Sequence, residues 1–251
     1  MEARKIIITG GATRIGAAIA KKLSGNKVEI VIHFNKSRTK AIALKKELEK
    51  NGTKIHLVKG NLNKEEDIRK IIKSSKKYLK YFDCLINNAS MFENDKLENF
   101  SSESWNKHLN INLKAPALLT REFAKNVKGK NNNVINIIDQ RVFKLTPFFF
   151  SYTLSKTGLY TLTKTSAMSL APKIRVNGIA PGPTIKNKRQ SEIHFKKQYL
   201  ATPLKKQVNV DEISSAVDFF IKTSSITGQV ISIDSGQSLN WQTPDIMRGK
   251  E

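Results

Sequence analysis

A chain of 251 residues, 39% of them hydrophobic, is long enough to bury a sizeable core, and an α/β fold of this length commonly forms one domain. The net charge of +23 raises the question of an anionic partner, but lysines outnumber arginines, basic residues are spread along the whole chain, and no known nucleic-acid motif appears. The composition therefore favours a solvated lysine-rich surface over a nucleic-acid-binding function.

Apolar runs alternate with helical patterns along the chain. We expect strands at 5–9, 28–34, 55–59, 84–87, 134–138, 175–179 and 230–233. We expect helices at 15–23, 37–49, 64–76, within 102–127, from 151 or 152 to about 170, and at 211–222, with an irregular segment at 183–206. Continuous Val, Ile and Leu runs separated by helices indicate an α/β fold with a parallel sheet covered on both faces. No internal repeat or linker is visible, so a single domain spanning 1–251 is predicted.

The cell compartment is indicated by the lone cysteine, Cys84, which excludes an internal disulfide and is typical of a reducing cytoplasm. Its setting, FDCLINNA, predicts a buried strand. No apolar run approaches transmembrane length, no metal-binding cluster is visible, and a strand so close to the start leaves no room for a signal peptide. We expect a cytoplasmic protein without a metal.

The first turn, TGGATRIG at 9–16, follows a strand and opens a helix. In this setting glycines let backbone N–H groups and the helix N-terminus approach a pyrophosphate, although Gly-rich turns also serve tight packing. The candidate cofactor contacts in the turn are Gly10, Arg14, Ile15 and Gly16.

The end of the second strand distinguishes between the two nicotinamide cofactors. NAD-binding folds usually place an acidic residue there, on the ribose 2′-hydroxyl. Here the chain continues as Asn35, Lys36, Ser37 and Arg38, without a carboxylate. Arg14 can converge with these residues on a 2′-phosphate, so NADPH is predicted; the alternative is that Lys36 and Arg38 are ordinary exposed bases.

The segment 139–156, DQRVFKLTPFFFSYTLSK, contains a candidate proton donor. At helical spacing Tyr152 and Lys156 share one face, and a nearby ammonium is expected to lower the Tyr152 pKa and make its hydroxyl a general acid. Tyr160 and Lys164 have the same spacing further along the helix. Ligands bind at the carboxyl ends of parallel strands, which favours Tyr152 as the functional residue and leaves Tyr160 as a packing residue.

Four motifs together resemble the short-chain dehydrogenase/reductase family: TGGATRIG, NNAS at 87–90, YTLSK at 152–156 and RVNGIAPGP at 175–183. They occur in the family's order over nearly the whole chain. The resemblance implies one Rossmann-type doubly wound domain and hydride transfer from a nicotinamide cofactor. It also implies that Tyr152 is the acid, that Lys156 binds the ribose, and that an asparagine completes a proton relay. Asn110 and Asn112 compete for that last role, and the LKAP that follows favours Asn112.

Two departures from the common family pattern are similar to its pteridine reductase branch, which includes dihydromonapterin reductases. Arg14 replaces the middle glycine of the turn, and Asp139 replaces the serine usually found upstream of the tyrosine. In that branch the arginine lies near cofactor and pterin, and the aspartate serves reduction of a ring C=N. Phe92, in NNASMF, matches an aromatic that sandwiches the pterin against the nicotinamide; a plain loop anchor is the alternative reading. Ser90 matches a polar contact to cofactor and substrate.

The resemblance implies further contacts and an assembly. Thr184, after the turn that contains Pro181 and Gly182, is expected at the nicotinamide carboxamide. The remaining cofactor contacts implied are Asn61 and Leu62 on the adenine side, and Asn88, Ala89 and Ser90. The segment 183–206 is the expected substrate cover, and the tail 237–251, with Trp241, is expected at a subunit interface of a homotetramer.

The function predicted is NADPH-dependent reduction of a dihydropterin such as dihydromonapterin, dihydrobiopterin or dihydrofolate. The predicted catalytic residues are Asp139, Tyr152, Lys156 and Asn112, and the predicted substrate contacts are Arg14, Ser90, Phe92, Asp139 and Tyr152. The alternatives are a carbonyl reductase, such as a 3-oxoacyl thioester reductase, and a non-catalytic protein that binds cofactor or nucleic acid. The charge of +23 is the only support for the last.

Overall fold

The computed structural model describes residues 4–129, 131–187 and 189–241. Its centre is a seven-stranded parallel sheet in the order β3-β2-β1-β4-β5-β6-β7, which confirms the predicted Rossmann-type α/β class. The strands are β1 (Arg4–Ile8), β2 (Val28–Phe34), β3 (Lys54–Lys59), β4 (Cys84–Asn87), β5 (Asn132–Ile137), β6 (Ile174–Pro181) and β7 (Val230–Ile233). The chain starts in the middle of this sheet, builds outward to β3, and then returns to β4 and builds the other half.

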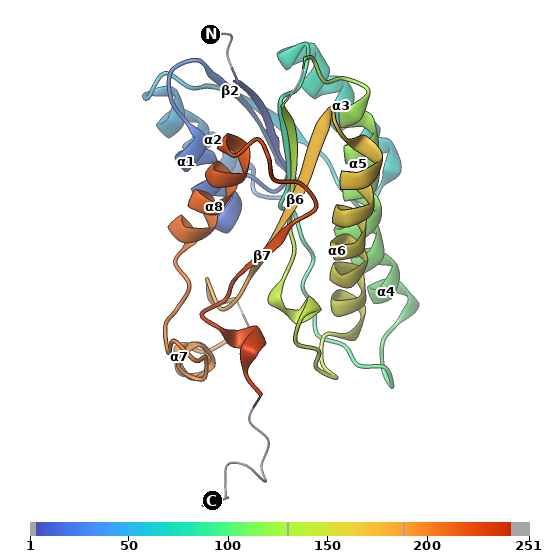
Figure 1. The fold of residues 1–251 in the computed structure, drawn as a ribbon, viewed down its shortest axis with the longest axis vertical. Coiled ribbons are helices and arrows are strands. Elements are labelled where there is room, and N and C mark those ends of the chain that lie inside the picture. Colours follow the sequence, from blue (N-terminus) through green and yellow to red (C-terminus); the bar gives the residue numbers. More distant parts are fainter. Residues whose placement is uncertain (1–3, 130, 188, 242–251) are drawn as a thin grey trace, which may run out of the picture.

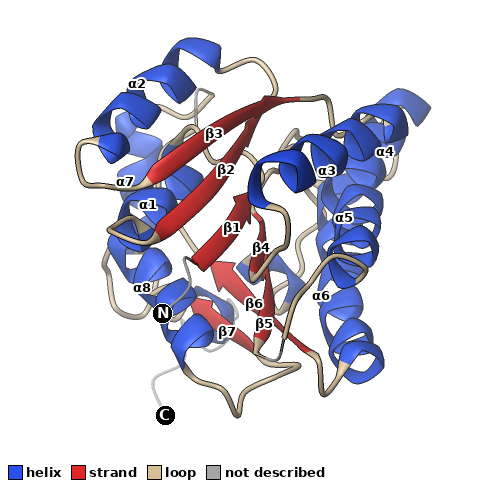
Figure 2. Ribbon diagram, turned by 90° about the horizontal axis from the view of Figure 1, so that it is seen from above, coloured by secondary structure: helices blue, strands red, loops and turns tan. Residues whose placement is uncertain are grey.

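Helices cover both faces of the sheet (Figures 1 and 2). One layer contains α1 (Arg14–Leu23), α2 (Arg38–Glu49) and α8 (Val210–Lys222); the other contains α3 (Glu65–Leu79), α4 (Ser102–Leu109), α5 (Ala115–Ala124) and α6 (Phe150–Leu170). A further helix, α7 (Glu192–Leu200), lies at the carboxyl end of the strands (Figure 1). Within the described residues, no helix is both long enough and apolar enough to cross a membrane.

The strands are continuously apolar because their alternate side chains pack into two hydrophobic cores, one on each face of the sheet. In β1, Ile6 and Ile8 pack with α1 and α8, whereas Ile7 points to the opposite face and packs with α3 and α5. All three side chains are fully buried, and burying an isoleucine contributes roughly 1.5–3 kcal/mol. This double burial is the physical reason for the unbroken Val and Ile runs.

Two segments differ from the sequence prediction. The helix expected within 102–127 consists of α4 and α5 joined by a π-helical turn at Asn110–Lys114. The segment 183–206, expected to be irregular, contains α7, whose N-terminus is capped by the Ser191 hydroxyl accepting from the His194 N–H. Both features depend on local hydrogen bonding rather than on an apolar repeat, and an apolar repeat is what the sequence patterns detect.

Candidate active site

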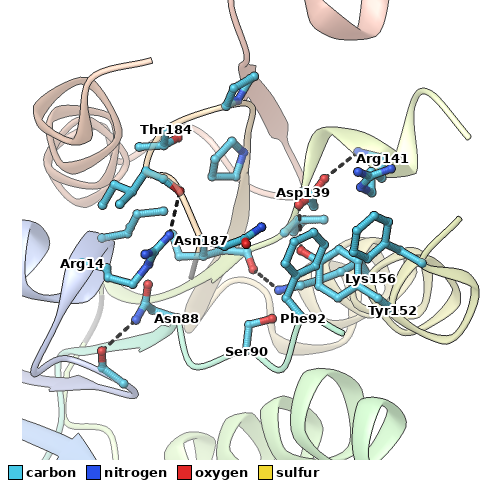
Figure 3. A pocket seen from close by; sticks show the side chains of 18 of the residues that line it. Arg14, Asn88, Ser90, Phe92, Asp139, Arg141, Tyr152, Lys156, Thr184 and Asn187 are labelled. Atoms are coloured by element: carbon cyan, nitrogen blue, oxygen red, sulfur yellow. Dashed lines mark hydrogen bonds between the residues drawn. The ribbon is translucent and has the colours of Figure 1, made fainter. Parts of the chain in front are cut away.

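A cavity of about 990 Å³ opens at the carboxyl end of the sheet, where ligands bind in open α/β folds (Figure 3). Its walls come from the turns after β1, β2, β3, β4, β5 and β6, from the first turns of α6, and from the segment around α7. Among the residues expected at the site, Lys36, Ser37, Arg38 and Asn112 do not line it, and the others do.

The glycine turn packs closely against the start of α1. Gly10 has a φ of +60°, a conformation that side chains disfavour, and a Cβ on Gly16 would lie 2.4 Å from the Gly10 carbonyl oxygen. The Asn88 amide donates to the Thr9 and Gly10 carbonyls and holds the turn from the side of β4. The first turn of α1 has no acidic residue and no side-chain cap, so its N–H groups remain available for an anion.

His33, at the end of β2, holds the glycine turn through a hydrogen bond to Gly10, a role that the sequence patterns did not indicate. Its Nδ1 accepts from the Gly10 N–H at 3.2 Å and its Nε2 lies 3.0 Å from the Gly60 carbonyl, so the ring is neutral with the proton on Nε2. Burial lowers the pKa of His33 to about 4, more than offsetting the Gly60 hydrogen bond.

Arg14 adopts a φ of +54°, which explains why a glycine is common at this position. Its guanidinium donates to the carbonyls of Ile185 at 2.8 Å and Lys186 at 3.0 Å, and so joins the glycine turn to the covering segment. In this arrangement the guanidinium is bound to the covering segment rather than directed at Lys36, Ser37 and Arg38, and their expected convergence on a 2′-phosphate stays a prediction. Burial also lowers the pKa of Arg14.

The end of β2 presents an anion-compatible edge next to the cavity. Asn35 lines the cavity, Lys36 and Arg38 are exposed, and Ser37 precedes α2 without capping it. The first turn of α2 contains no acidic residue. A free helix N-terminus flanked by two cations is compatible with a bound phosphate. The 2′-phosphate contacts of Lys36, Ser37 and Arg38 stay a prediction.

Asp139 and Tyr152 are in direct contact at the cavity floor. The Tyr152 hydroxyl donates to Asp139 Oδ2 at 2.7 Å, and Asp139 Oδ1 accepts from the Arg141 N–H (Figure 3). The start of α6 is fixed from outside the helix, because the Ser151 N–H donates to the Asp95 carboxylate. Asp95 thus orients the turn that carries Tyr152.

The expected effect of Lys156 on the tyrosine is wrong for this structure. Burial raises the pKa of Tyr152 well above its ordinary value, and the Asp139 carboxylate raises it further. Lys156 Nζ donates to the Ile137 carbonyl at 2.8 Å, and burial lowers the Lys156 pKa to about 8. The ammonium lies 5.7 Å from the Tyr152 ring centroid, so the carboxylate is the closer charge to the hydroxyl. Helical spacing alone could not reveal that competition.

Asn112 is buried in the π-helical turn and has a structural set of partners. Its amide donates to the Met91 carbonyl and the Ser155 hydroxyl, and its oxygen accepts from the Met91 N–H and the Ser90 hydroxyl. It therefore positions the loop after β4, and the expected relay role stays a prediction. Asn110, the competing candidate, donates to Asn63 outside the cavity lining.

Phe92 forms part of an aromatic cluster that the sequence only partly indicated. Its ring stacks on Phe149 at 4.5 Å, with 4° between the planes, and meets the edge of Tyr152 at 4.6 Å. The guanidinium carbons of Arg141 and Arg189 lie 6.0 and 5.8 Å from the Phe92 ring centroid. A plain loop anchor would not line the cavity beside Tyr152, so the geometry favours a role for Phe92 at the substrate end.

Several lining residues were not singled out by the sequence analysis. Those outside the expected substrate cover at 183–206 are Thr13, Asn94, Ile111, Ile137, Ile138, Gln140, Arg141, Phe148, Phe149 and Gln237, and those within it are Ile185, Asn187, Arg189, Gln190, His194, Phe195 and Gln198. Arg141, Phe148 and Phe149 belong to the segment 139–156, where the run of aromatics was a usable signal. Those around α7 lie in the segment expected to cover the substrate, but they carry no motif, so only the tertiary structure shows which of them face the cavity.

Comparison with known proteins identifies the class to which this fold and site belong. The model of the short chain dehydrogenase family matches residues 4–196, so the chain belongs to the short-chain dehydrogenase/reductase family. Among solved structures it is similar to FolM alternative dihydrofolate reductase 1 from Brucella canis, complexed with NADP. The two are 40% identical with a TM-score of 0.92, over 96% of each chain.

The same enzyme from Brucella suis, also in complex with NADP, matches equally at 40% identity and a TM-score of 0.92, over 96% of this chain and 98% of that one. A second group of relatives acts on other substrates. The chain is 31% identical over 240 residues to the 3-oxoacyl-[acyl-carrier-protein] reductase FabG of Buchnera aphidicola, over 93% of this chain and 97% of the relative. It is 28% identical over 245 residues to glucose 1-dehydrogenase 2 of Bacillus subtilis, over 93% and 94%.

Proposed function

We propose that this protein is an NADPH-dependent reductase of the C=N bond of a dihydropterin. The observation that carries the proposal is the Asp139 carboxylate at the cavity floor, 2.7 Å from the Tyr152 hydroxyl, where the common family pattern has a serine. The Brucella relatives, which are named dihydrofolate reductases, support the same substrate class.

The residues of the cavity fit a nicotinamide dinucleotide. The absence of a side chain at Gly16 lets α1 begin close against Gly10, and the uncapped first turn of α1 lies where a pyrophosphate would bind. Lys156 would hold the nicotinamide ribose, and Thr184, which is buried beside Gly182, would meet the carboxamide. When bound, NADPH supplies the hydride that reduces the ring carbon.

The chain's own residues handle the proton. Reduction of C=N leaves a nitrogen that must take a proton, and a carboxyl group relayed by water or the Tyr152 phenol is suited to deliver it. The raised pKa of Tyr152 keeps its hydroxyl protonated at neutral pH, but it also makes the phenol a weaker acid than an ordinary tyrosine, so transfer of its proton requires a basic nitrogen to develop beside it during reduction. The face of Phe92 that Phe149 leaves uncovered would hold the pterin at the distance hydride transfer needs.

The proposal is tested by NADPH oxidation with dihydromonapterin, dihydrobiopterin and dihydrofolate, run beside an acetoacetyl thioester. Tyr152→Phe should lose pterin turnover by about a hundredfold or more, and Asp139→Ser should impair it. Tyr160→Phe is the matched control, because Tyr160 has the same spacing to a lysine but packs on Phe143 outside the cavity. Thioester turnover without pterin turnover would instead assign the carbonyl reductase function that the FabG relative favours.

The non-catalytic alternative is tested separately. A nucleic-acid-binding role for the +23 charge requires duplex DNA binding that persists at physiological ionic strength. We expect negligible binding there. We also infer a cytoplasmic protein whose single-domain subunits form a homotetramer, an assembly that light scattering would measure. Trp241, the last described residue of the tail 237–251, is exposed, and 242–251 lie outside the described residues.

A further inference from the structure

The charge that lines the cavity is strongly unbalanced. Among the described lining residues, Arg14, Lys156, Arg141 and Arg189 are cationic, and Asp139 is the one carboxylate. A concave site lined by one sign of charge concentrates ligands of the opposite sign. The cavity is therefore suited to a ligand, or a pair of ligands, with more than one anionic group.

The three arginines divide between the two ends of the cavity, and Lys156 is the residue expected to hold the nicotinamide ribose. Figure 3 shows Arg14 beside the glycine turn and Arg141 on the opposite side, next to Asp139. Arg189 lies with Arg141 at the aromatic end, since both guanidiniums are close to the Phe92 ring. Cofactor phosphates at the glycine turn would account for Arg14 but not for the other two.

Arg141 and Arg189 keep most of their hydrogen-bonding capacity free. A guanidinium has five N–H donors. Arg141 uses Nη1 to reach the Thr146 hydroxyl, and Arg189 uses Nη2 to reach the Phe92 carbonyl. Neither forms an ion pair with a described carboxylate, whereas the surface residues Arg69 and Arg121 each pair with a glutamate.

The aromatic cluster also orients the two guanidiniums. Arg141 lies 4.6 Å from the Phe149 ring centroid, and Phe149 is held by the Asn94 side chain, which accepts from its backbone N–H. Stacking on a ring fixes the plane of a guanidinium and leaves its edge, where the N–H groups are, directed outward. That edge is the part of arginine that matches a carboxylate or a phosphate.

We propose that Arg141 and Arg189 bind an anionic group, a carboxylate or a phosphate ester, on the side chain of the pterin substrate. The inference rests on the proposed pterin reductase function and makes these arginines specificity-determining residues. A pterin with a neutral polyol side chain is then a poorer substrate than one with a charged side chain.

The test compares kcat/KM for three dihydropterins by NADPH oxidation: dihydromonapterin as the neutral substrate, dihydrofolate as the carboxylate and a phosphate ester of dihydroneopterin. The readout is the ratio of kcat/KM for each anionic substrate to that for the neutral one. This ratio cancels any general loss from the altered contact between Arg189 and the Phe92 carbonyl. Because a hydrogen bond to a charged group is lost, Arg189→Gln and Arg141→Gln should each lower the ratio about 10- to 100-fold, mainly through KM.

Two further variants separate charge from structure. Arg189→Lys should retain part of the ratio, since it keeps the charge but not the fork of donors. Arg121→Gln, on α5 and outside the cavity, should leave both activity and ratio unchanged. The anionic substrate whose ratio falls identifies the group as carboxylate or phosphate.

An unchanged ratio in both glutamine variants, or a wild-type preference for the neutral pterin, would overturn this inference and leave the pterin reductase function standing. Absence of turnover with every dihydropterin would overturn both.

Discussion

The neutral His33 below the glycine turn makes the stability of this protein depend on pH. Burial lowers the His33 pKa from 6.5 to about 4. Between pH 6.5 and pH 4 the imidazole is therefore protonated in the unfolded chain and neutral in the folded chain. Stability from the neutral ring is complete above pH 6.5 and is lost as the pH falls towards 4. By linkage the loss is about 2 kcal/mol at pH 5 and about 3 kcal/mol at pH 4.

The assay is urea unfolding of the wild type and of His33→Asn at several pH values between 8 and 4. Other acidic groups titrate in both proteins, so the difference between the two free energies of unfolding isolates His33. The wild type should be more stable at pH 8, because the shorter asparagine amide cannot span Gly10 and Gly60 as the imidazole does. That advantage should shrink by about 2 kcal/mol on going to pH 5. A difference that stays constant from pH 8 to pH 4 would refute the neutral, buried state of His33.

Three further substitutions test other parts of the site and fold. Gly16→Ala should weaken NADPH binding at least tenfold in a fluorescence titration, since its Cβ would lie 2.4 Å from the Gly10 carbonyl; unchanged affinity would contradict the close approach. Lys156→Met should be inactive yet at least as stable at pH 7, because burial lowers the Lys156 pKa to about 8. Below pH 8 the wild type must keep a charged lysine buried, which costs stability that the methionine variant does not lose. As the pH rises from 8 to 10.5 this cost disappears, so the stability advantage of the variant over the wild type should fade in denaturant titrations. Arg175→Met should destabilise the protein by about 3 kcal/mol or more in thermal unfolding, because the buried Arg175 donates to the last carbonyls of α8 and to Asn131; a shift in Tm of less than one degree would exclude that role.

The sequence by itself determined the elements that repeat. Each strand buries both faces, so its apolar run is continuous and could be read directly, and all seven strands were predicted within two residues of their ends. The glycine turn could also be found from its motif, and Tyr152 and Lys156 from their helical spacing and their place after a strand, whereas Asp139 was found through the resemblance to the family pattern. Local chemistry was enough for these features.

Only the tertiary structure decided how those residues interact. The state of Tyr152 depends on burial and on the distance to Asp139, 13 positions earlier in the chain, and neither is encoded in helical spacing. Arg14 reaches carbonyls 171 and 172 positions away, and Arg189 meets Phe92 across 97. The covering segment, 183–206, has no apolar periodicity from which its helix α7 could have been predicted. Contacts between distant loops follow from how the finished sheet brings its strand ends together, and a one-dimensional pattern does not contain that information.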